Sequence, residues 1–329
     1  MTLCATGEDR DDDGIFTVRV VFFGFQTWGQ RTLQALIDSG HTVPLAVTHP
    51  SSEQSYRAIF SDSVEDLARA NGIDVHLTDR ADAETIELVR RAEPDLIVVN
   101  SWYTWMSADL YAMPKYGTIN LHDSLLPKFT GFSPVLWALI SGADEFGLTI
   151  HRMDEQLDTG DILLQRSLPI GPTATGTELV EAGLELIPEA LNEALTAIES
   201  GTAQWTPQDK SARTYFHKRS DRDSLLDWTW PAADLERLVR ALSDPYPSAF
   251  TYYRGERIEV ISAQVSSAVY GGTQGRVVVQ EGGGLVICGP ESFRGQNQGL
   301  IIKQVRLADG SEVSGEEFFT RGGYLTETA

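Results

Sequence analysis

Residues 18–100 alternate short apolar runs with helical segments, and this alternation constrains the fold most. Parallel strands need a crossover connection, and a helix is the usual one. The runs are rich in Val, Ile and Phe, which is typical of strands buried on both faces. The sequence therefore predicts an α/β fold with a mostly parallel sheet. The expected strands are residues 18–23, 43–48, 73–77 and 95–100, and the expected helices are residues 29–40, 64–70 and 84–92.

Another apolar run, residues 116–119, leads into Asn120-Leu121-His122. Every second side chain of a strand points to the same face, so Asn120 and His122 are expected on one side. They follow the run, which places them at the carboxyl edge of the sheet, where open α/β proteins bind ligands. Further elements are expected as helices at residues 135–141 and 177–200 and strands at residues 147–153 and 162–170.

The pattern changes after a polar segment, residues 206–219. After this segment one helix is expected, at residues 235–242, and the rest of the chain consists of short alternating runs between Gly-rich turns. This pattern is typical of a small β-barrel. We expect a disordered acidic tail (1–16), a first domain (17–211) and a second domain (212–329). The runs are residues 249–253, 257–265, 276–280, 284–288 and 300–307.

The composition is that of an ordinary globular protein, with 42% hydrophobic and 22% charged residues in a chain of 329. No apolar run approaches the ~20 residues that span a bilayer. The acidic tail lacks the basic-then-apolar order of a signal peptide. Disorder is expected for it, and metal binding is the less favoured alternative. Cys4 and Cys288 form neither a disulfide framework nor a metal signature. A cytoplasmic protein without a metal is expected.

The net charge is −21, because 47 acidic residues oppose 26 basic ones. Clustered Lys and Arg bind phosphate backbones, so a nucleic-acid partner would need a local basic patch. The best candidate is His217-Lys218-Arg219 with Arg222. The negative net charge favours a small-molecule partner over a nucleic acid. Solubility or adaptation to salt explains this charge at least as well.

Three motifs resemble the 10-formyltetrahydrofolate-dependent formyltransferases: Asn120-x-His122, Ser-Leu-Leu-Pro at residues 124–127 and Leu-Asp-Thr-Gly at residues 157–160. Leu-Asp-Trp at residues 226–228 and Pro-Tyr-Pro-Ser-Ala-Phe at residues 245–250 resemble the C-terminal domain of methionyl-tRNA and sugar formyltransferases. The resemblance covers nearly the whole chain. It implies a Rossmann-like catalytic domain, an OB-like barrel, 10-formyltetrahydrofolate as co-substrate and no metal.

Formyl transfer to nitrogen requires an oxyanion donor and a group that takes the amine proton. The resemblance implies that Asn120 donates to the oxyanion, that His122 donates to it or takes the proton, and that Asp158 orients His122 and favours its charged form. A turn-forming Asn and a structural His are the alternative. A Ser124-His122-Asp158 hydrolase is a rival, but Ser124 lacks the Gly-x-Ser-x-Gly context.

The resemblance also implies a pterin pocket after the strand at residues 95–100, where backbone groups pair with the pterin edge. Core packing is the alternative for its aromatic residues. The expected cofactor-binding residues are Trp102, Tyr103, Thr104, Trp105, Met106, Glu155 and Gln156, with Leu125 beside the formyl group.

The loop at residues 24–29 is not Gly-x-Gly-x-x-Gly, and bulky Phe25 and Trp28 argue against nicotinamide binding. A small acceptor is expected to contact this loop and the residues after His122; a helix start is the alternative for the loop. Asp123 replaces a small residue usual in methionyl-tRNA formyltransferase-like sequences, and an acid here would pair with an ammonium group and repel phosphate. The expected substrate-binding residues are Gln26, Thr27, Trp28, Asp123 and Ser124.

Residues 23–29, 48–50, 122–127 and 216–219 are most similar to hydroxyornithine formyltransferases of siderophore biosynthesis. We therefore expect δ-N-hydroxyornithine as the acceptor, since its hydroxylamine nitrogen is neutral at pH 7, and neither a nucleic-acid nor a membrane partner. Methionyl-tRNA formyltransferase, amino-sugar nucleotide formyltransferase and a non-catalytic folate-sensing module are the alternatives. The oligomeric state is not predicted.

Overall fold

The computed structural model describes residues 17–50, 60–280 and 282–328, so the expected acidic tail lies outside the described residues. The chain divides into two compact units. One comprises Met1–Gly131, Gly147–Leu168 and Ala182–Tyr215, and the other comprises Phe132–Phe146, Pro169–Glu181 and Phe216–Ala329. The domain limits expected from the sequence stay predictions.

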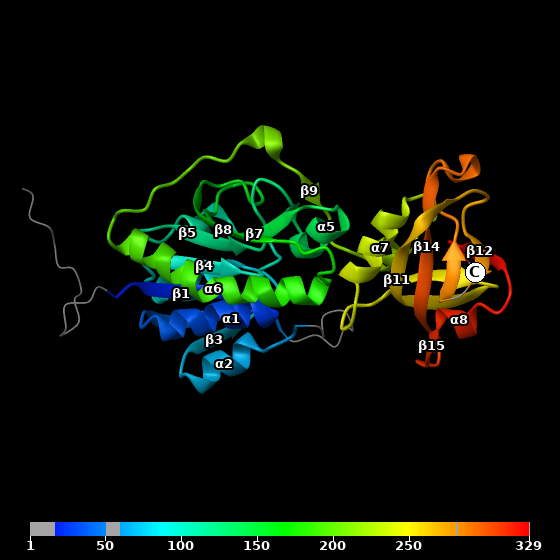
Figure 1. The fold of residues 1–329 in the computed structure, drawn as a ribbon. Coiled ribbons are helices and arrows are strands. Elements are labelled where there is room, and N and C mark those ends of the chain that lie inside the picture. The colour runs from blue at the N-terminus through cyan, green and yellow to red at the C-terminus, as the bar shows by residue number, and fades with distance from the viewer. Residues whose placement is uncertain (1–16, 51–59, 281, 329) are drawn as a thin grey trace, which may run out of the picture. The chain divides into compact units, whose positions relative to one another are not determined.

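The first unit is built on a seven-stranded sheet in the order β3-β2-β1-β4-β5-β7-β8 (Figure 1). The pairs from β3 to β5 are parallel, and β5 pairs antiparallel with β7. The expected mostly parallel, Rossmann-like sheet is confirmed. The strands are β1 (Arg19–Gly24), β2 (Thr42–Thr48), β3 (Asp74–Leu77), β4 (Leu96–Asn100), β5 (Thr118–His122), β7 (Glu145–Arg152) and β8 (Ile162–Pro169).

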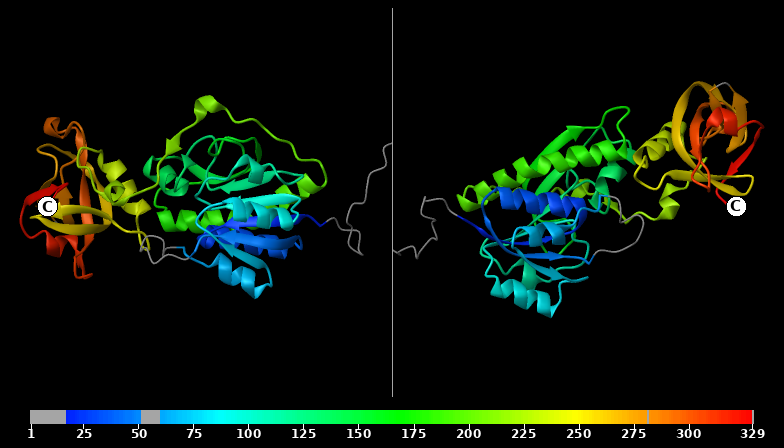
Figure 2. Two further views of the ribbon diagram at one scale, coloured as in Figure 1. Left: turned by 180° about the vertical axis from the view of Figure 1, so that it is seen from behind. Right: turned by 90° about the horizontal axis from the view of Figure 1, so that it is seen from below.

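Helices cover both faces of this sheet (Figure 2). On one face α1 and α6 lie side by side, and Arg31 of α1 pairs with Glu185 of α6 at 3.1 Å. The other face buries Phe23 and Val99 against Val89 of α3 and Leu110 of α4. The helices around this sheet are α1 (Gln26–Asp38), α2 (Val64–Ala70), α3 (Ala83–Arg91), α4 (Ala108–Tyr111) and α6 (Gly176–Glu199), whereas α5 (Pro134–Ile140) belongs to the second unit. A small two-stranded sheet joins β6 (Thr130–Gly131) and β9 (Tyr215–Phe216).

Helix α1 begins at Gln26, three residues before the expected start, and thereby takes in most of the loop expected to contact the acceptor. Its N-cap residue, Phe25, makes no capping hydrogen bond through its side chain, so the usual polar start signal is missing. Gly29 allows the helix to approach the sheet closely, because a Cβ there would lie 2.8 Å from the carbonyl carbon of Gly24.

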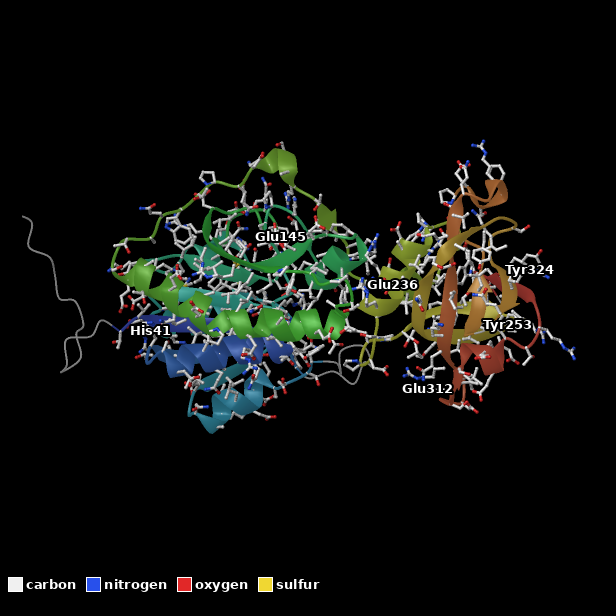
Figure 3. All side chains as sticks on the ribbon, in the orientation of Figure 1. His41, Glu145, Glu236, Tyr253, Glu312 and Tyr324 are labelled. Carbon is white, nitrogen blue, oxygen red and sulfur yellow. The ribbon has the colours of Figure 1, made fainter. Side chains whose placement is uncertain are left out.

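The second unit contains an antiparallel barrel closed by six strands in the order β11-β10-β16-β12-β13-β14, where β14 pairs back with β11. Tyr253 and Tyr324 lie on strands of this barrel (Figure 3). The Tyr253 hydroxyl donates to the Arg321 carbonyl at 2.9 Å. The expected barrel is confirmed. The helices and strands of the second unit after residue 216 are α7 (Ala232–Ala241), β10 (Ala249–Tyr253), β11 (Glu256–Tyr270), β12 (Arg276–Gln280), β13 (Gly283–Val286), β14 (Asn297–Arg306), β15 (Glu312–Ser314), α8 (Gly315–Phe318) and β16 (Gly323–Thr326).

None of the helices in the described ranges is both long enough and apolar enough to cross a membrane.

Candidate active site

Strand β5 presents Asn120 and His122 on one face, near its carboxyl end. Because β7 runs antiparallel beside it, His151 lies directly opposite Asn120, and Thr149 lies opposite His122. The site is therefore assembled from two neighbouring strands and from the loop that carries Asp158. It combines two imidazoles, one amide and one carboxylate.

His122 is buried, with 6% of its surface exposed. Its Nε2 lies 3.0 Å from the Phe129 carbonyl oxygen, and a carbonyl only accepts hydrogen bonds, so Nε2 carries a proton and donates it. Its Nδ1 faces Asp158 Oδ2 at 3.9 Å, which is too far for a direct hydrogen bond. Nδ1 is therefore the ring atom that can exchange a proton with a substrate.

The Asp158 carboxylate and its loop are held by residues of other segments. Its backbone has a φ of +53°, and its Oδ2 accepts a hydrogen bond from the Gly131 amide at 3.0 Å. The Gln208 side chain donates to the carbonyls of Asp158 and Gly160, at 2.9 and 2.8 Å. A left-handed residue that is not glycine costs free energy unless its surroundings fix it, and these contacts fix the carboxylate opposite His122.

Gly160→Ala is expected to destabilise the protein by ~1–3 kcal/mol, because the new Cβ would lie 2.0 Å from the Arg152 carbonyl oxygen and overpack the loop. The displaced loop should also lower kcat by moving Asp158. Gly171→Ala is the matched control, since the nearest atom to its Cβ would be 3.9 Å away. Urea unfolding of both variants measures the difference, and equal stability would contradict the close packing of this loop.

His151 is a site residue that the sequence interpretation missed. Its Nε2 lies 3.1 Å from Asn120 Nδ2 and 3.9 Å from Asp158 Oδ1, and its Nδ1 lies 2.7 Å from the Arg152 carbonyl oxygen. Desolvation lowers the pKa of His151, and the nearby charge of Asp158 partly opposes this shift. The only signal in the sequence was a His near the end of an expected strand, seven residues before Asp158.

The Ser-His-Asp hydrolase finds no support in the geometry. The Ser124 hydroxyl donates to the Lys128 carbonyl at 2.8 Å, while the two nitrogens of His122 face Phe129 and Asp158. The Ser124 amide donates to the His122 carbonyl at 2.8 Å, but within the described residues no hydrogen bond joins the Ser124 hydroxyl to the His122 ring. Ser124 instead closes the turn that begins after β5.

Asp123 is half-buried, and desolvation raises the pKa of its carboxyl group. Burial therefore favours the neutral form, which does not repel phosphate as an ion would. The argument from the charge of Asp123 against an acceptor that carries phosphate is therefore weaker than the sequence interpretation assumed.

The loop after β4 offers polar groups that fit a pterin. Trp102 Nε1, Thr104 Oγ1 and Ser107 Oγ are buried and have no hydrogen-bond partner within the described residues. Buried polar groups normally find partners, so donors and acceptors here are suited to a heteroaromatic ring with polar edges. The loop begins at Ser101, whose φ is +60°.

The aromatic residues of this loop do not all lie together. Trp102 and Tyr103 stack on the His49 ring, with centroid distances of 3.9 and 3.8 Å. Trp105 is 64% exposed, whereas Met106 is 3% exposed and packs in the core. Of the remaining expected residues, Leu125 is half-buried, and Glu155 and Gln156 are exposed.

At the expected acceptor loop, Thr27 is tied to the neighbouring segment. Its amide donates to the Phe60 carbonyl at 2.9 Å, and its hydroxyl accepts from the Asp62 amide at 3.3 Å. Gln26 is the first residue of α1, and Trp28 is half-buried in its first turn. Thr27 therefore has a structural role at the helix start, which was the alternative reading.

Two family matches cover most of the chain. Residues 18–195 match the family described as formyl transferase, and residues 218–322 match the formyl transferase C-terminal domain. The methionyl-tRNA formyltransferase of Lachnospira eligens is 36% identical over 314 residues, which are 94% of this chain and 98% of that protein. The methionyl-tRNA formyltransferase of Pseudomonas fluorescens is 32% identical over 305 residues, or 92% and 93% of the two chains.

Solved structures share the fold at lower identity. WlaRD, a sugar 3N-formyltransferase crystallised with dTDP and 5-N-formyl-THF, has a TM-score of 0.63 and 15% identity over 87% of this chain and 97% of that chain. The N-formyltransferase of Helicobacter canadensis, in complex with folinic acid and dTDP-3-aminofucose, has the same TM-score and identity over 87% and 99%. At such identities the likeness shows the fold alone.

The chain belongs to the formyl transferase family. The enzyme class expected from its motifs, a 10-formyltetrahydrofolate-dependent N-formyltransferase, is thereby confirmed. The matches support the family resemblance and do not show a particular closeness to siderophore enzymes.

The expected acceptor, δ-N-hydroxyornithine, is wrong, and so is the expectation that no nucleic acid is a partner. Five relatives that are 32–36% identical over most of the chain are each a methionyl-tRNA formyltransferase. The error was to treat the net charge of −21 as if it described the site, whereas phosphate binding depends on the local distribution of charge.

Proposed function

We propose that this chain transfers the formyl group of 10-formyltetrahydrofolate to the α-amino group of methionyl-tRNA. The observation that carries the acceptor is the 36% identity with a methionyl-tRNA formyltransferase over 94% of this chain. The grouping of Asn120, His122 and Asp158 at the edge of the sheet supports the chemistry. The expected cytoplasmic location belongs to this proposal, because translation takes place there.

When bound, the folate supplies the formyl group, and the chain's own residues manage the charge and the proton. An amide nitrogen has two N–H groups, and Asn120 Nδ2 uses one of them toward His151, so the other can donate to the developing oxyanion. His122 Nδ1 takes the proton that leaves the attacking amine, and it can return this proton to the donor nitrogen as the bond between that nitrogen and the formyl carbon breaks. Asp158, 3.9 Å away, stabilises the resulting imidazolium by its charge.

We place the pterin in the loop after β4. Trp102 Nε1, Thr104 Oγ1 and Ser107 Oγ lie buried there without partners in the described ranges, and each can bond to a polar ring edge. Leu125, in the turn after His122, would line the side of the formyl group. Met106 belongs to the core and is left out of this proposed pocket.

Binding of methionyl-tRNA is expected to weaken as salt rises, with a slope of log K against log salt of ~0.7–0.9 per phosphate contacted. Lys218 and Arg222 are exposed residues of the basic segment that would supply such contacts. Arg222→Gln should reduce the slope by ~1 if it contacts a phosphate. Fluorescence titration of labelled tRNA at several salt concentrations measures the slope.

Arg294→Gln is the matched control, because Arg294 is exposed but paired with Glu291 at 3.2 Å. Its slope should equal that of the wild type. An affinity for methionyl-tRNA that does not change with salt would contradict a nucleic-acid partner.

A further inference from the structure

We propose that His151 is a positioning residue for formyl transfer. As a neutral imidazole protonated on Nδ1, it holds the Asn120 amide with its N–H groups, and not its oxygen, available to the oxyanion. The inference rests on the proposed formyl transfer but not on the identity of the acceptor.

The hydrogen bonds of His151 define its tautomer. Nδ1 lies 2.7 Å from the Arg152 carbonyl oxygen, which only accepts, so Nδ1 carries the proton. In a neutral imidazole the other nitrogen is then an acceptor. Nε2 lies 3.1 Å from Asn120 Nδ2, so the Asn120 amide is the donor in this bond. Desolvation, which lowers the pKa of His151, favours the same neutral form.

This bond decides which end of the Asn120 amide faces which neighbour. If the amide were turned over, its oxygen would face the lone pair of His151 Nε2, and two acceptors repel each other. The same turned amide would present its oxygen, and not an N–H group, to the oxyanion. His151 disfavours this orientation. Because His151 is 2% exposed, little water competes for the bond.

The neutral state of His151 also divides the charge within the cluster. Asp158 faces both imidazoles, with Oδ1 3.9 Å from His151 Nε2 and Oδ2 3.9 Å from His122 Nδ1. A protonated His151 would donate from Nε2, compete with His122 for the carboxylate and force the Asn120 amide to turn. A neutral His151 leaves the carboxylate charge to the imidazolium that forms on His122.

The tautomer can be measured without any substrate. A two-bond ¹H–¹⁵N spectrum of protein labelled in histidine, with His151 assigned by the loss of its signals in His151→Gln, is expected to show a neutral ring protonated on Nδ1 at pH 7. A ring protonated on Nε2, or on both nitrogens, would overturn the proposal even if formyl transfer itself is confirmed.

Kinetics then test the role in positioning. His151→Ala is expected to lower kcat ~10-fold while both KM values change less than ~2-fold, because the oriented amide acts in the transition state. His151→Gln should recover most of this loss, since its carbonyl oxygen can accept from Asn120. In the Asn120→Ala background, His151→Ala should have little further effect, because coupled residues are not additive.

Losses of kcat that multiply in the double variant would overturn the proposal. So would an effect of His151→Ala on KM instead of kcat. His76→Gln is the matched control, since His76 lies on β3, away from the site, and bonds to Thr85 of α3. The kcat of this variant should be that of the wild type. Urea unfolding identifies any variant that is merely unfolded. If another amine proves to be the acceptor, the same ratios of kcat between variant and wild type are measured with that amine. Failure of the proposed acceptor is then distinguishable from failure of the role proposed for His151.

Discussion

His122→Ala is expected to lower kcat by about 10²- to 10⁴-fold, the usual contribution of a positioned general acid or base. His122 is the ring whose Nε2 is fixed by the Phe129 carbonyl and whose Nδ1 faces Asp158 across 3.9 Å. Its loss removes the proton acceptor but few of the contacts that bind substrate, so both KM values should change much less than kcat. Single-turnover formylation measures the chemical step directly.

The variant should remain folded, because His122 forms one side-chain hydrogen bond to the backbone at the end of β5. Its urea midpoint is therefore compared with that of the wild type before the rates are interpreted. A folded His122→Ala protein whose single-turnover rate falls less than ~10-fold would remove His122 from the proposed chemistry.

Asn120→Ala is expected to lower kcat by about 10²- to 10³-fold, as does the loss of one side-chain donor from an oxyanion hole. The bond to the oxyanion exists only in the transition state, so kcat and kcat/KM should fall by the same factor. The measurement is steady-state kinetics over a range of both substrates.

Asn100→Ala is the matched control, because Asn100 ends the neighbouring strand β4 and its amide donates to Thr32 Oγ1 at 2.8 Å. This variant should lose stability but keep the rate of the chemical step. An equal loss of rate in Asn100→Ala and Asn120→Ala would contradict a specific role for the Asn120 amide.

Much of the first sheet can be predicted because its strands are local apolar runs. The limits of β2 and β4, for example, lie within one residue of the expected ones. The start of α1 was misplaced because Phe25 gives no polar capping signal. The barrel strands were less well predicted: β11 extends to Tyr270, five residues beyond its expected end, because its length depends on pairing with β14. Strand β16, Gly-Tyr-Leu-Thr, was missed because its two apolar residues are adjacent and show no alternation.

The candidate site shows the same division between local and long-range information. Asn120 and His122 share a face because of strand alternation, which a sequence reveals. His151 joins them through the antiparallel register of β5 and β7, which pairs it with Asn120, 31 residues away. No local pattern fixes that register. The direction of Asp158 depends likewise on a left-handed backbone and on Gly131.

The acceptor was mispredicted for a different physical reason. Net charge describes the whole chain, including acidic residues far from any site, and it cannot show where a phosphate would lie. Asp123 was read as a fixed anion, but its carboxyl is half-buried and desolvation raises its pKa.

The most direct test is a mass-spectrometric formylation assay with 10-formyltetrahydrofolate and separate samples of methionyl-tRNA, hydroxyornithine and an amino-sugar nucleotide. We expect one formyl group on the methionine of methionyl-tRNA, no product on the two small molecules, and almost no product with His122→Ala. Formylation of a small molecule with none on methionyl-tRNA would contradict the proposed acceptor. No product on any of them would contradict the proposed function altogether.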